Sequence, residues 1–182
     1  MGYNDEFSDL AEMVLAPWIA KATALTACYR KVGGNQFRHA ISTMGILIDY
    51  HYIDSVILKT AIIHDLIEDI PSTDINELKN IDTDSCQVIP LVLEVTRRDR
   101  EEKHDFLKRI RFQGSREAKI IKCADRISNL TDLHQGIFDK AYMLHYIDQS
   151  EEYVYPMAQE EDEYMAFEIK DLIERRRKCL LI

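Results

Sequence analysis

The sequence predicts an all-α protein that folds as a single domain. Apolar residues recur at helical spacing through most of the chain, and no segment of useful length alternates apolar and polar residues as a strand would. A length of 182 residues fits one domain, and 46% hydrophobic residues can form a sizeable core. Because no internal repeat or low-complexity linker divides the chain, we expect one domain over residues 1–182, with its core in about 20–150 and C-terminal helices in 151–182.

The composition limits which partners the protein can bind and in which cellular compartment it can be expected. The net charge is −9, whereas a protein that binds nucleic acid needs a basic face for the phosphate backbone. No apolar run approaches the roughly 20 residues of a membrane span, and the acidic N-terminus lacks the basic region of a signal peptide. The four cysteines are scattered without a C-x-x-C pair, as expected of free thiols in a reducing compartment. We therefore expect a cytoplasmic protein without nucleic-acid or membrane partners, which can still take a small anionic substrate beside a metal and a few basic side chains.

The first third of the chain is predicted to form helices that are interrupted at two places. Residues 9–30 have helical periodicity, and Pro17 marks either a break or the first turn of a second helix. The Gly-Gly-Asn sequence at 33–35 predicts a loop, and the periodicity resumes over 38–50. His39 lies at the beginning of that helix.

Residues 54–70 are predicted to form one continuous helix that carries an unusual set of polar groups. Asp54 can cap its start, and Pro71 blocks its continuation. A histidine and three acidic residues interrupt its aliphatic run: His64, Asp65, Glu68 and Asp69. Residues three and four apart share a face of a helix, so these groups should meet in one small volume. Since unpaired buried charge is costly, the composition suits a divalent metal site with spare carboxylates for acid–base work.

The remainder of the chain is predicted to continue as helices between polar loops. Asp74 can cap a short helix, and the charged run 97–103 reads as a solvated loop or a helix start. Pro156 suits the first turn of a final helix. Helices are expected over about residues 88–95, 106–112, 117–133, 137–149 and 156–178.

Three of these elements each carry a possible metal ligand beside apolar residues. The candidates are His39, His64 with Asp65, and Asp125, and Asn129 lies one turn beyond Asp125. Each has an ordinary structural explanation when taken alone, such as a surface Asp–Arg pair for Asp125. Taken together, two imidazoles and two carboxylates suit Mn²⁺, Fe²⁺, Zn²⁺ or another divalent ion with positions left open for water and substrate.

The order of these residues resembles that of the HD superfamily of metal-dependent phosphohydrolases. Residues 64–69 look like the HDxxED signature of the RelA/SpoT-type hydrolase domains, which remove the 3′-pyrophosphate of (p)ppGpp. Residues 93–97 are similar to the short V-T-K/R segment of that family, and residues 121–130 resemble its I-K-L-A-D-R-x-x-N-L run. The resemblance covers about residues 20–150 and implies a single HD-domain helical bundle, like the small stand-alone hydrolases of the metazoan SpoT-homologue kind.

The resemblance also implies roles for individual residues. His39, His64, Asp65 and Asp125 would ligate one metal, usually Mn²⁺. Glu68 and Asp69 would activate water and manage protons, and Asn129 would contact the nucleotide. The basic segment that helps the family to hold its nucleotide is thinner here, over residues 21–31. Lys21 and Arg30 are candidate replacements or solvated charges, and Tyr146 is a candidate nucleotide contact or a packed tyrosine. Arg97 and Lys122 have the same two explanations as the lysine and arginine above, and for both we favour a solvated surface charge.

The leading hypothesis is therefore a Mn²⁺-dependent phosphohydrolase that removes pyrophosphate from a (p)ppGpp-like nucleotide. A close variant removes the 2′-phosphate of NADPH, and a second enzymatic alternative is an HD-type 5′-nucleotidase or dNTP hydrolase. A non-enzymatic alternative is a nucleotide-binding regulatory protein. The retained pair Glu68 and Asp69 argues against that alternative, because mutually repelling carboxylates destabilise an empty pocket.

Overall fold

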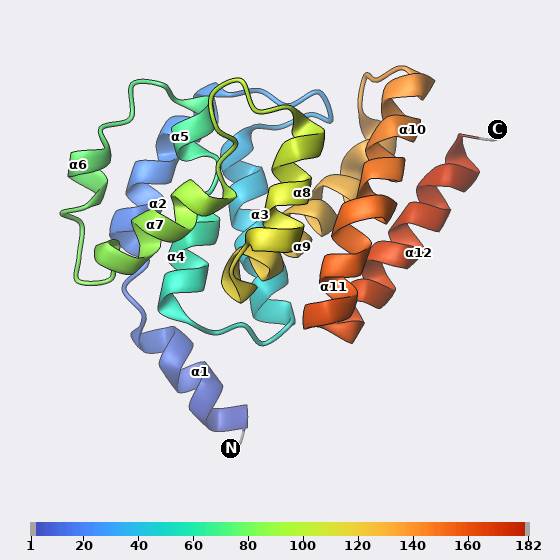
Figure 1. The fold of residues 1–182 in the computed structure, drawn as a ribbon. Coiled ribbons are helices and arrows are strands. Elements are labelled where there is room, and N and C mark those ends of the chain that lie inside the picture. The colour runs from blue at the N-terminus through green and yellow to red at the C-terminus, as the bar shows by residue number, and fades with distance from the viewer. Residues whose placement is uncertain (1–2, 181–182) are drawn as a thin grey trace.

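The computed structural model describes residues 3–180, and helices joined by loops account for its regular structure within this range (Figure 1). The elements are α1 (Tyr3–Glu12), α2 (Ala16–Ala22), η1 (Thr23–Ala27), α3 (Gln36–Asp49), α4 (Ser55–Ile63), α5 (Leu66–Asp69), α6 (Ile75–Leu78), α7 (Ser85–Val95), α8 (Lys103–Gln113), α9 (Arg116–Asp132), η2 (Leu133–Gln135), α10 (Lys140–Gln149), η3 (Ser150–Val154), α11 (Tyr155–Glu161) and α12 (Glu163–Cys179). The described residues include no strand, apart from an isolated β-bridge between Tyr29 and Asn35. The predicted all-α class is confirmed.

The bundle is organised around α9, which is buried along most of its length. It packs against α3, α11 and α12. One large apolar cluster surrounds α9 and the C-terminal helices, and a second lies between α2, α4 and α7. None of the helices within residues 3–180 combines the length and apolar character that crossing a bilayer requires.

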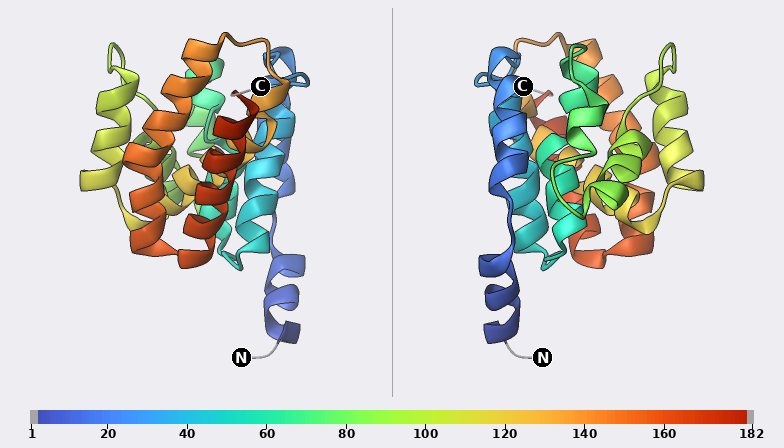
Figure 2. Two further views of the ribbon diagram at one scale, coloured as in Figure 1. Left: turned by 90° about the vertical axis from the view of Figure 1, so that its right-hand side faces the viewer. Right: turned by 90° about the vertical axis from the view of Figure 1, so that its left-hand side faces the viewer.

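The N-terminal segment is divided more finely than its periodicity suggests. Pro17 lies in the first turn of α2, which is one of the two expected outcomes, and α1 ends before it at Glu12. Figure 2 shows α1 extending beyond the rest of the bundle at one end. The loop over 28–35, the start of α8 and the segment before α10 lie at the opposite end, together with α5 (Figure 1).

The predicted continuous helix over 54–70 is wrong, because it is interrupted at His64 and Asp65. Asp54 caps α4 as expected, accepting hydrogen bonds from the backbone N–H groups of Val56 at 2.9 Å and Ile57 at 3.0 Å. Asp65 then adopts φ −96° and ψ −4°, in the sparsely populated region between helix and strand. The chain resumes as the short helix α5.

The predicted helix over 156–178 is also divided. Pro156 lies in the first turn of α11, as expected, but Asp162 is extended, with φ −158° and ψ 110°. Its carboxylate caps α12 by accepting from the backbone N–H groups of Tyr164 and Met165. The π-helical turn η3 joins α10 to α11, so the C-terminal part contains three α-helices where the sequence predicts two.

Candidate active site

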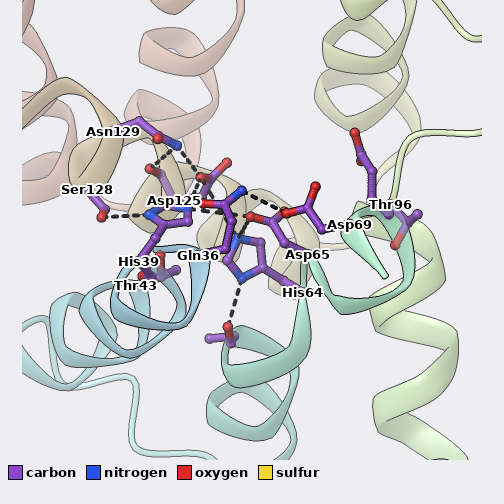
Figure 3. Close-up of polar contacts among 12 residues, drawn as sticks. Gln36, His39, Thr43, His64, Asp65, Asp69, Thr96, Asp125, Ser128 and Asn129 are labelled. Atoms are coloured by element: carbon purple, nitrogen blue, oxygen red, sulfur yellow. Dashed lines mark hydrogen bonds and ion pairs between the residues drawn. The ribbon is translucent and has the colours of Figure 1, made fainter. Parts of the chain in front are cut away.

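Two histidines and an aspartate from distant segments meet at one buried point (Figure 3). His39 lies in the first turn of α3, His64 directly follows α4, and Asp125 lies within α9. Each side chain offers one ligand atom, and these atoms lie within 4.8 Å of one another. His39 Nε2 is 3.0 Å from Asp125 Oδ1, and the two imidazole rings stand edge to face with their centroids 5.3 Å apart. The fold thus assembles a candidate metal-binding cluster from three helices.

Asp65 adds a second carboxylate to this point. Its Oδ2 is 3.2 Å from His64 Nε2 and 3.7 Å from His39 Nε2. Consecutive side chains on a regular helix point about 100° apart, so His64 and Asp65 could not easily converge if the helix continued. The turn between α4 and α5 lets both side chains face the same point.

Contacts behind the two imidazoles fix their orientation. His64 Nδ1 lies 2.8 Å from the carbonyl oxygen of Ala61, and His39 Nδ1 lies 2.9 Å from the hydroxyl of Ser128. A carbonyl oxygen can only accept, so Nδ1 of His64 carries the donated hydrogen and Nε2 of the neutral ring is left with its lone pair. This is the tautomer that a metal ligand needs.

The donor set and one unpaired atom fit a divalent metal. His64 Nε2 is buried and has no hydrogen-bond partner among the described residues, since its approach to Asp65 lacks hydrogen-bond geometry. Two imidazole nitrogens and two carboxylates match the preferences of Mn²⁺, Fe²⁺ or Zn²⁺. A cation held by His39, His64, Asp65 and Asp125 would give this nitrogen a partner and balance the two carboxylates.

The pKa values of these groups reflect the close packing of opposite charges. Burial alone lowers the pKa of His64, but the charges of Asp65 and Asp125 outweigh it and raise the pKa to about 9. Burial alone raises the pKa of each carboxyl group, but the His64 charge holds that of Asp65 well below its usual range. For Asp125, Lys122 and then His39 have the same effect. Protons and a metal ion therefore compete for the same cluster.

Glu68 and Asp69 stand beside the cluster, each held by a different neighbour. Glu68 accepts a hydrogen bond from the backbone N–H of Arg97 at 3.3 Å and pairs with its guanidinium at 3.2 Å. Asp69 accepts a hydrogen bond from Gln36 Nε2 at 2.8 Å. Burial, and then the charge of Asp65, raises the pKa of Asp69. The two carboxylates are therefore in different environments, as a proton-accepting and a proton-donating group would need.

A cavity of about 320 Å³ lies over the cluster and gives it access to solvent. His39, Asp65 and Asp125 line it, and so do Glu68 and Asp69. The candidate ligands and the candidate proton-handling groups consequently face one common space.

Comparison with protein-family models and with curated proteins gave no match to this sequence. The structure does match solved structures. One of them is described as a metazoan ortholog of SpoT that hydrolyzes ppGpp and plays a role in starvation responses. The TM-score is 0.77 at 22% sequence identity, over 89% of this chain and 94% of the other. The chain has the HD-domain fold. The fold expected from the resemblance of its motifs is thereby confirmed.

Within this HD-domain fold, Asn129 connects the candidate metal cluster to Arg30. Asn129 Nδ2 donates to Asp125 Oδ1 at 2.5 Å, and Arg30 Nη2 donates to Asn129 Oδ1 at 2.6 Å. Both Arg30 and Asn129 line the cavity. The guanidinium is thus held at the edge of the site by a side chain that also touches a candidate metal ligand.

An aromatic wall, formed by Phe138, Tyr142 and Tyr146, lines another part of the cavity. Phe138 and Tyr142 are stacked with centroids 4.6 Å apart, and Tyr142 and Tyr146 are 6.2 Å apart. The guanidinium of Arg126 covers Tyr146 at 4.1 Å from the ring centroid, and burial raises the pKa of the Tyr146 hydroxyl. Tyr146 therefore presents a fixed ring and a neutral hydroxyl group.

The structure separates Lys21 from the other predicted site residues. Lys21 Nζ pairs with Glu77 Oε2 at 2.5 Å on the protein surface, and Lys21 does not line the cavity. Its place in the basic segment of the sequence was its only connection with the site.

Several of the residues that line the cavity were not identified from the sequence. The expectation that Lys122 is solvated is wrong, because its ammonium group is buried and contacts Asp125 Oδ2. The hydrophobic neighbours of Lys122 within α9 were a signal that could have placed it inside. No comparable signal marks Lys103, whose sequence surroundings are strongly charged. The other unpredicted lining residues that bear on function are Tyr29, Lys31, Gln36, Phe138 and Tyr142.

Proposed function

We propose that the protein is a metal-dependent phosphohydrolase that removes the 3′-diphosphate from a (p)ppGpp-like nucleotide. The observation that carries this proposal is the convergence of His39, His64 and Asp125 at one buried point beneath a cavity that also contains Glu68 and Asp69. The similar solved structure is described as hydrolysing ppGpp, which supports the same class of substrate.

His39, His64, Asp65 and Asp125 would hold the metal, for which Mn²⁺ is our first candidate. When bound, a divalent ion lowers the pKa of water and neutralises charge on phosphoryl oxygens. Asn129 and Ser128 would keep the ligands oriented, since each contacts one of them. The hydrogen bond that His64 Nδ1 donates to the carbonyl oxygen of Ala61 would serve the same purpose.

Glu68 and Asp69 would manage the protons of the reaction. The oxygen of water attacks the phosphorus atom that is attached to the ribose, the bond from this phosphorus to the ribose oxygen breaks, and pyrophosphate leaves. Glu68, which Arg97 holds in place, accepts the proton of the attacking water. Asp69, whose pKa is raised, supplies a proton to the ribose oxygen. Positioned acid–base groups of this kind contribute typically about 10²–10⁴-fold in rate.

The remaining lining residues suit a nucleotide. The aromatic wall offers ring faces for a base, an interaction worth about 1–3 kcal/mol per base in single-stranded nucleic-acid complexes. Four cationic side chains line the cavity and would offset its carboxylates as an anionic substrate enters: Arg30, Lys31, Lys103 and Lys122. Local charge can therefore favour phosphate although the whole chain carries −9.

A substrate screen with the metal-loaded protein tests this function. Purified protein should release pyrophosphate from ppGpp in the presence of Mn²⁺ and lose this activity when a chelator is added. Release of phosphate from NADPH instead would identify a 2′-phosphatase, and turnover of dNMPs or dNTPs would identify a nucleotidase or dNTP hydrolase. Absence of turnover of every nucleotide at full metal occupancy would overturn the enzymatic function and leave a nucleotide-binding protein.

A further inference from the structure

Asp69 ends a helix of a single turn, which cannot by itself fix the direction of its side chain. Helix α5 comprises four residues, and the next residue, Ile70, has already left the helical region, with φ −121° and ψ 85°. Helices this short are marginal without tertiary contacts. The orientation of the Asp69 carboxyl group must therefore come from neighbours outside α5.

Gln36 holds this carboxyl group from the neighbouring helix α3. Its Nε2 donates a hydrogen bond of 2.8 Å to Asp69 Oδ2, and both side chains line the cavity (Figure 3). Carboxylate oxygens can only accept, so the amide must turn its NH₂ group toward Asp69. Gln36 is the first residue of α3 and lies one turn before His39, on the same face of that helix. The hydrogen bond therefore joins Asp69 to the helix that supplies a candidate metal ligand.

Cys28 completes a closed ring of contacts around Asp69. The backbone N–H of Gln36 donates to the carbonyl oxygen of Cys28 at 2.9 Å, and the thiol of Cys28 lies 3.7 Å from the carbonyl oxygen of Asp69. Each of the three residues thus contacts the other two. A thiol is a weak donor, so the amide bond is the stronger of the two contacts with Asp69. The ring keeps the end of α5 at a fixed position relative to the start of α3.

The other end of the Gln36 amide is unfavourable for stability. Its Oε1 is buried and has no hydrogen-bond partner in the part of the chain that the structure describes. A buried acceptor that is left unpaired costs free energy, whereas an apolar side chain of similar length would avoid this cost. The contact of its NH₂ group with Asp69 therefore explains a glutamine at this position better than packing does.

We propose that Gln36 is a positioning residue, which fixes the carboxyl group of Asp69 at the cavity so that Asp69 can transfer a proton to the leaving ribose oxygen. The inference rests on the proposed function and deepens it. Proton transfer requires the donor to lie within hydrogen-bond reach of the accepting atom, and a misplacement of about 1 Å can cost on the order of 10²-fold in rate. Gln36 acts through Asp69 and not on the substrate, so its loss should lower kcat and leave KM nearly unchanged.

Steady-state kinetics of ppGpp hydrolysis with Mn²⁺ test this role in Gln36→Met, in Asp69→Asn and in the double variant. Gln113→Met is the matched control, because Gln113 is exposed at the end of α8. We expect Gln36→Met to lower kcat about 10- to 100-fold, the effect of losing one hydrogen bond to a charged group, with KM within about twofold and the Mn²⁺ content unchanged.

The double variant shows whether Gln36 acts through Asp69. In the Asp69→Asn background, Gln36→Met should have no further effect on kcat, because the side chain that it positions no longer transfers a proton. An equal effect of Gln36→Met in both backgrounds, or an equal loss of kcat in Gln113→Met, would overturn the proposal.

Two measurements without turnover separate this role from a structural one. Gln36→Met should melt at the same temperature as the wild type or higher, because it removes an unpaired buried acceptor. In NMR spectra of the isotope-labelled, metal-free protein, the side-chain amide signal of Gln36 should shift in Asp69→Ala, while that of Gln113 stays in place. A lower melting temperature of Gln36→Met, or a Gln36 amide signal that does not respond to Asp69→Ala, would overturn the positioning role.

The positioning role and the proposed activity can fail independently. Release of pyrophosphate from ppGpp by the wild type, combined with an unchanged kcat in Gln36→Met, would remove only the positioning role. A Gln36 amide signal that depends on Asp69, without turnover of any nucleotide, would overturn the hydrolase function while supporting the contact between the two side chains.

Discussion

The hydrogen bond from His64 Nδ1 to the carbonyl oxygen of Ala61, 2.8 Å long, determines what the other ring nitrogen can do. It directs Nε2 toward the two carboxylates of the cluster. In the absence of a cation, the charges of Asp65 and Asp125 favour a proton on this nitrogen and raise the pKa of His64 to about 9. A metal ion held by this nitrogen would have to displace that proton, so metal affinity should depend on pH through His64.

Manganese should bind more tightly as pH rises from 6 toward 9. Below the His64 pKa of about 9, binding of each Mn²⁺ releases one proton from this ring, so the apparent affinity should increase up to about tenfold per pH unit and then level off. Titration calorimetry in buffers with different ionisation enthalpies would measure the number of protons released. A pH-independent affinity with no proton release would show that His64 does not ligate the metal.

Replacement of Glu68 by glutamine should remove proton transfer while preserving the shape of the site. Glutamine can still accept hydrogen bonds from Arg97, but it is a poor base, so kcat should fall about 10²–10⁴-fold with the Mn²⁺ content unchanged. Single-turnover kinetics and metal analysis would measure both quantities. Glu77→Gln is the matched control, because Glu77 pairs with Lys21 outside the cavity. A Glu68→Gln enzyme with kcat within a few-fold of the wild type would exclude Glu68 as the base.

The helix boundaries divide into those that are fixed by local sequence and those that are fixed by tertiary contacts. Side-chain caps at Asp54 and Asp74 mark starts that the sequence predicts correctly. The interruption at His64 and Asp65 has no glycine or proline, and the aliphatic periodicity continues through it, so no local signal announces it. The contacts of these two side chains with His39 and Asp125 come from other helices, which a sequence pattern does not reveal.

The capping bond at the start of α4 should contribute measurably to stability. Asp54→Ala removes the acceptor of two backbone N–H groups and should lower the free energy of unfolding by about 1 kcal/mol. Urea denaturation of the metal-free protein would measure the change. Asp54→Asn, which retains a capping oxygen, should restore most of the loss. A similar loss in both variants would mean that the negative charge, and not the cap, supports the helix.

The candidate metal cluster joins parts of the chain that are far apart in sequence. His39 and Asp125 are separated by 86 positions and lie on α3 and α9, which pack against each other in the centre of the bundle. The order of histidines and aspartates in the sequence predicted this meeting through its resemblance to a family. The positions of Phe138 and Tyr142 in the aromatic wall could not be predicted in the same way, because they depend on which face of the chain around α10 turns toward the cavity.

A metal that links three helices should stabilise the whole molecule. Binding to the folded state alone adds roughly 2.7 kcal/mol when Mn²⁺ is present at about 100 times its Kd. For a chain of this size that corresponds to a rise in Tm of about 5–10 °C. Asp125→Ala removes one candidate ligand from the centre of α9, so thermal unfolding of this variant should respond to Mn²⁺ only at much higher concentrations, while Glu77→Gln should respond like the wild type. Because the unfolded chain cannot bring His39, His64 and Asp125 together, an equal Mn²⁺ effect on Asp125→Ala and wild type would place the metal elsewhere in the molecule.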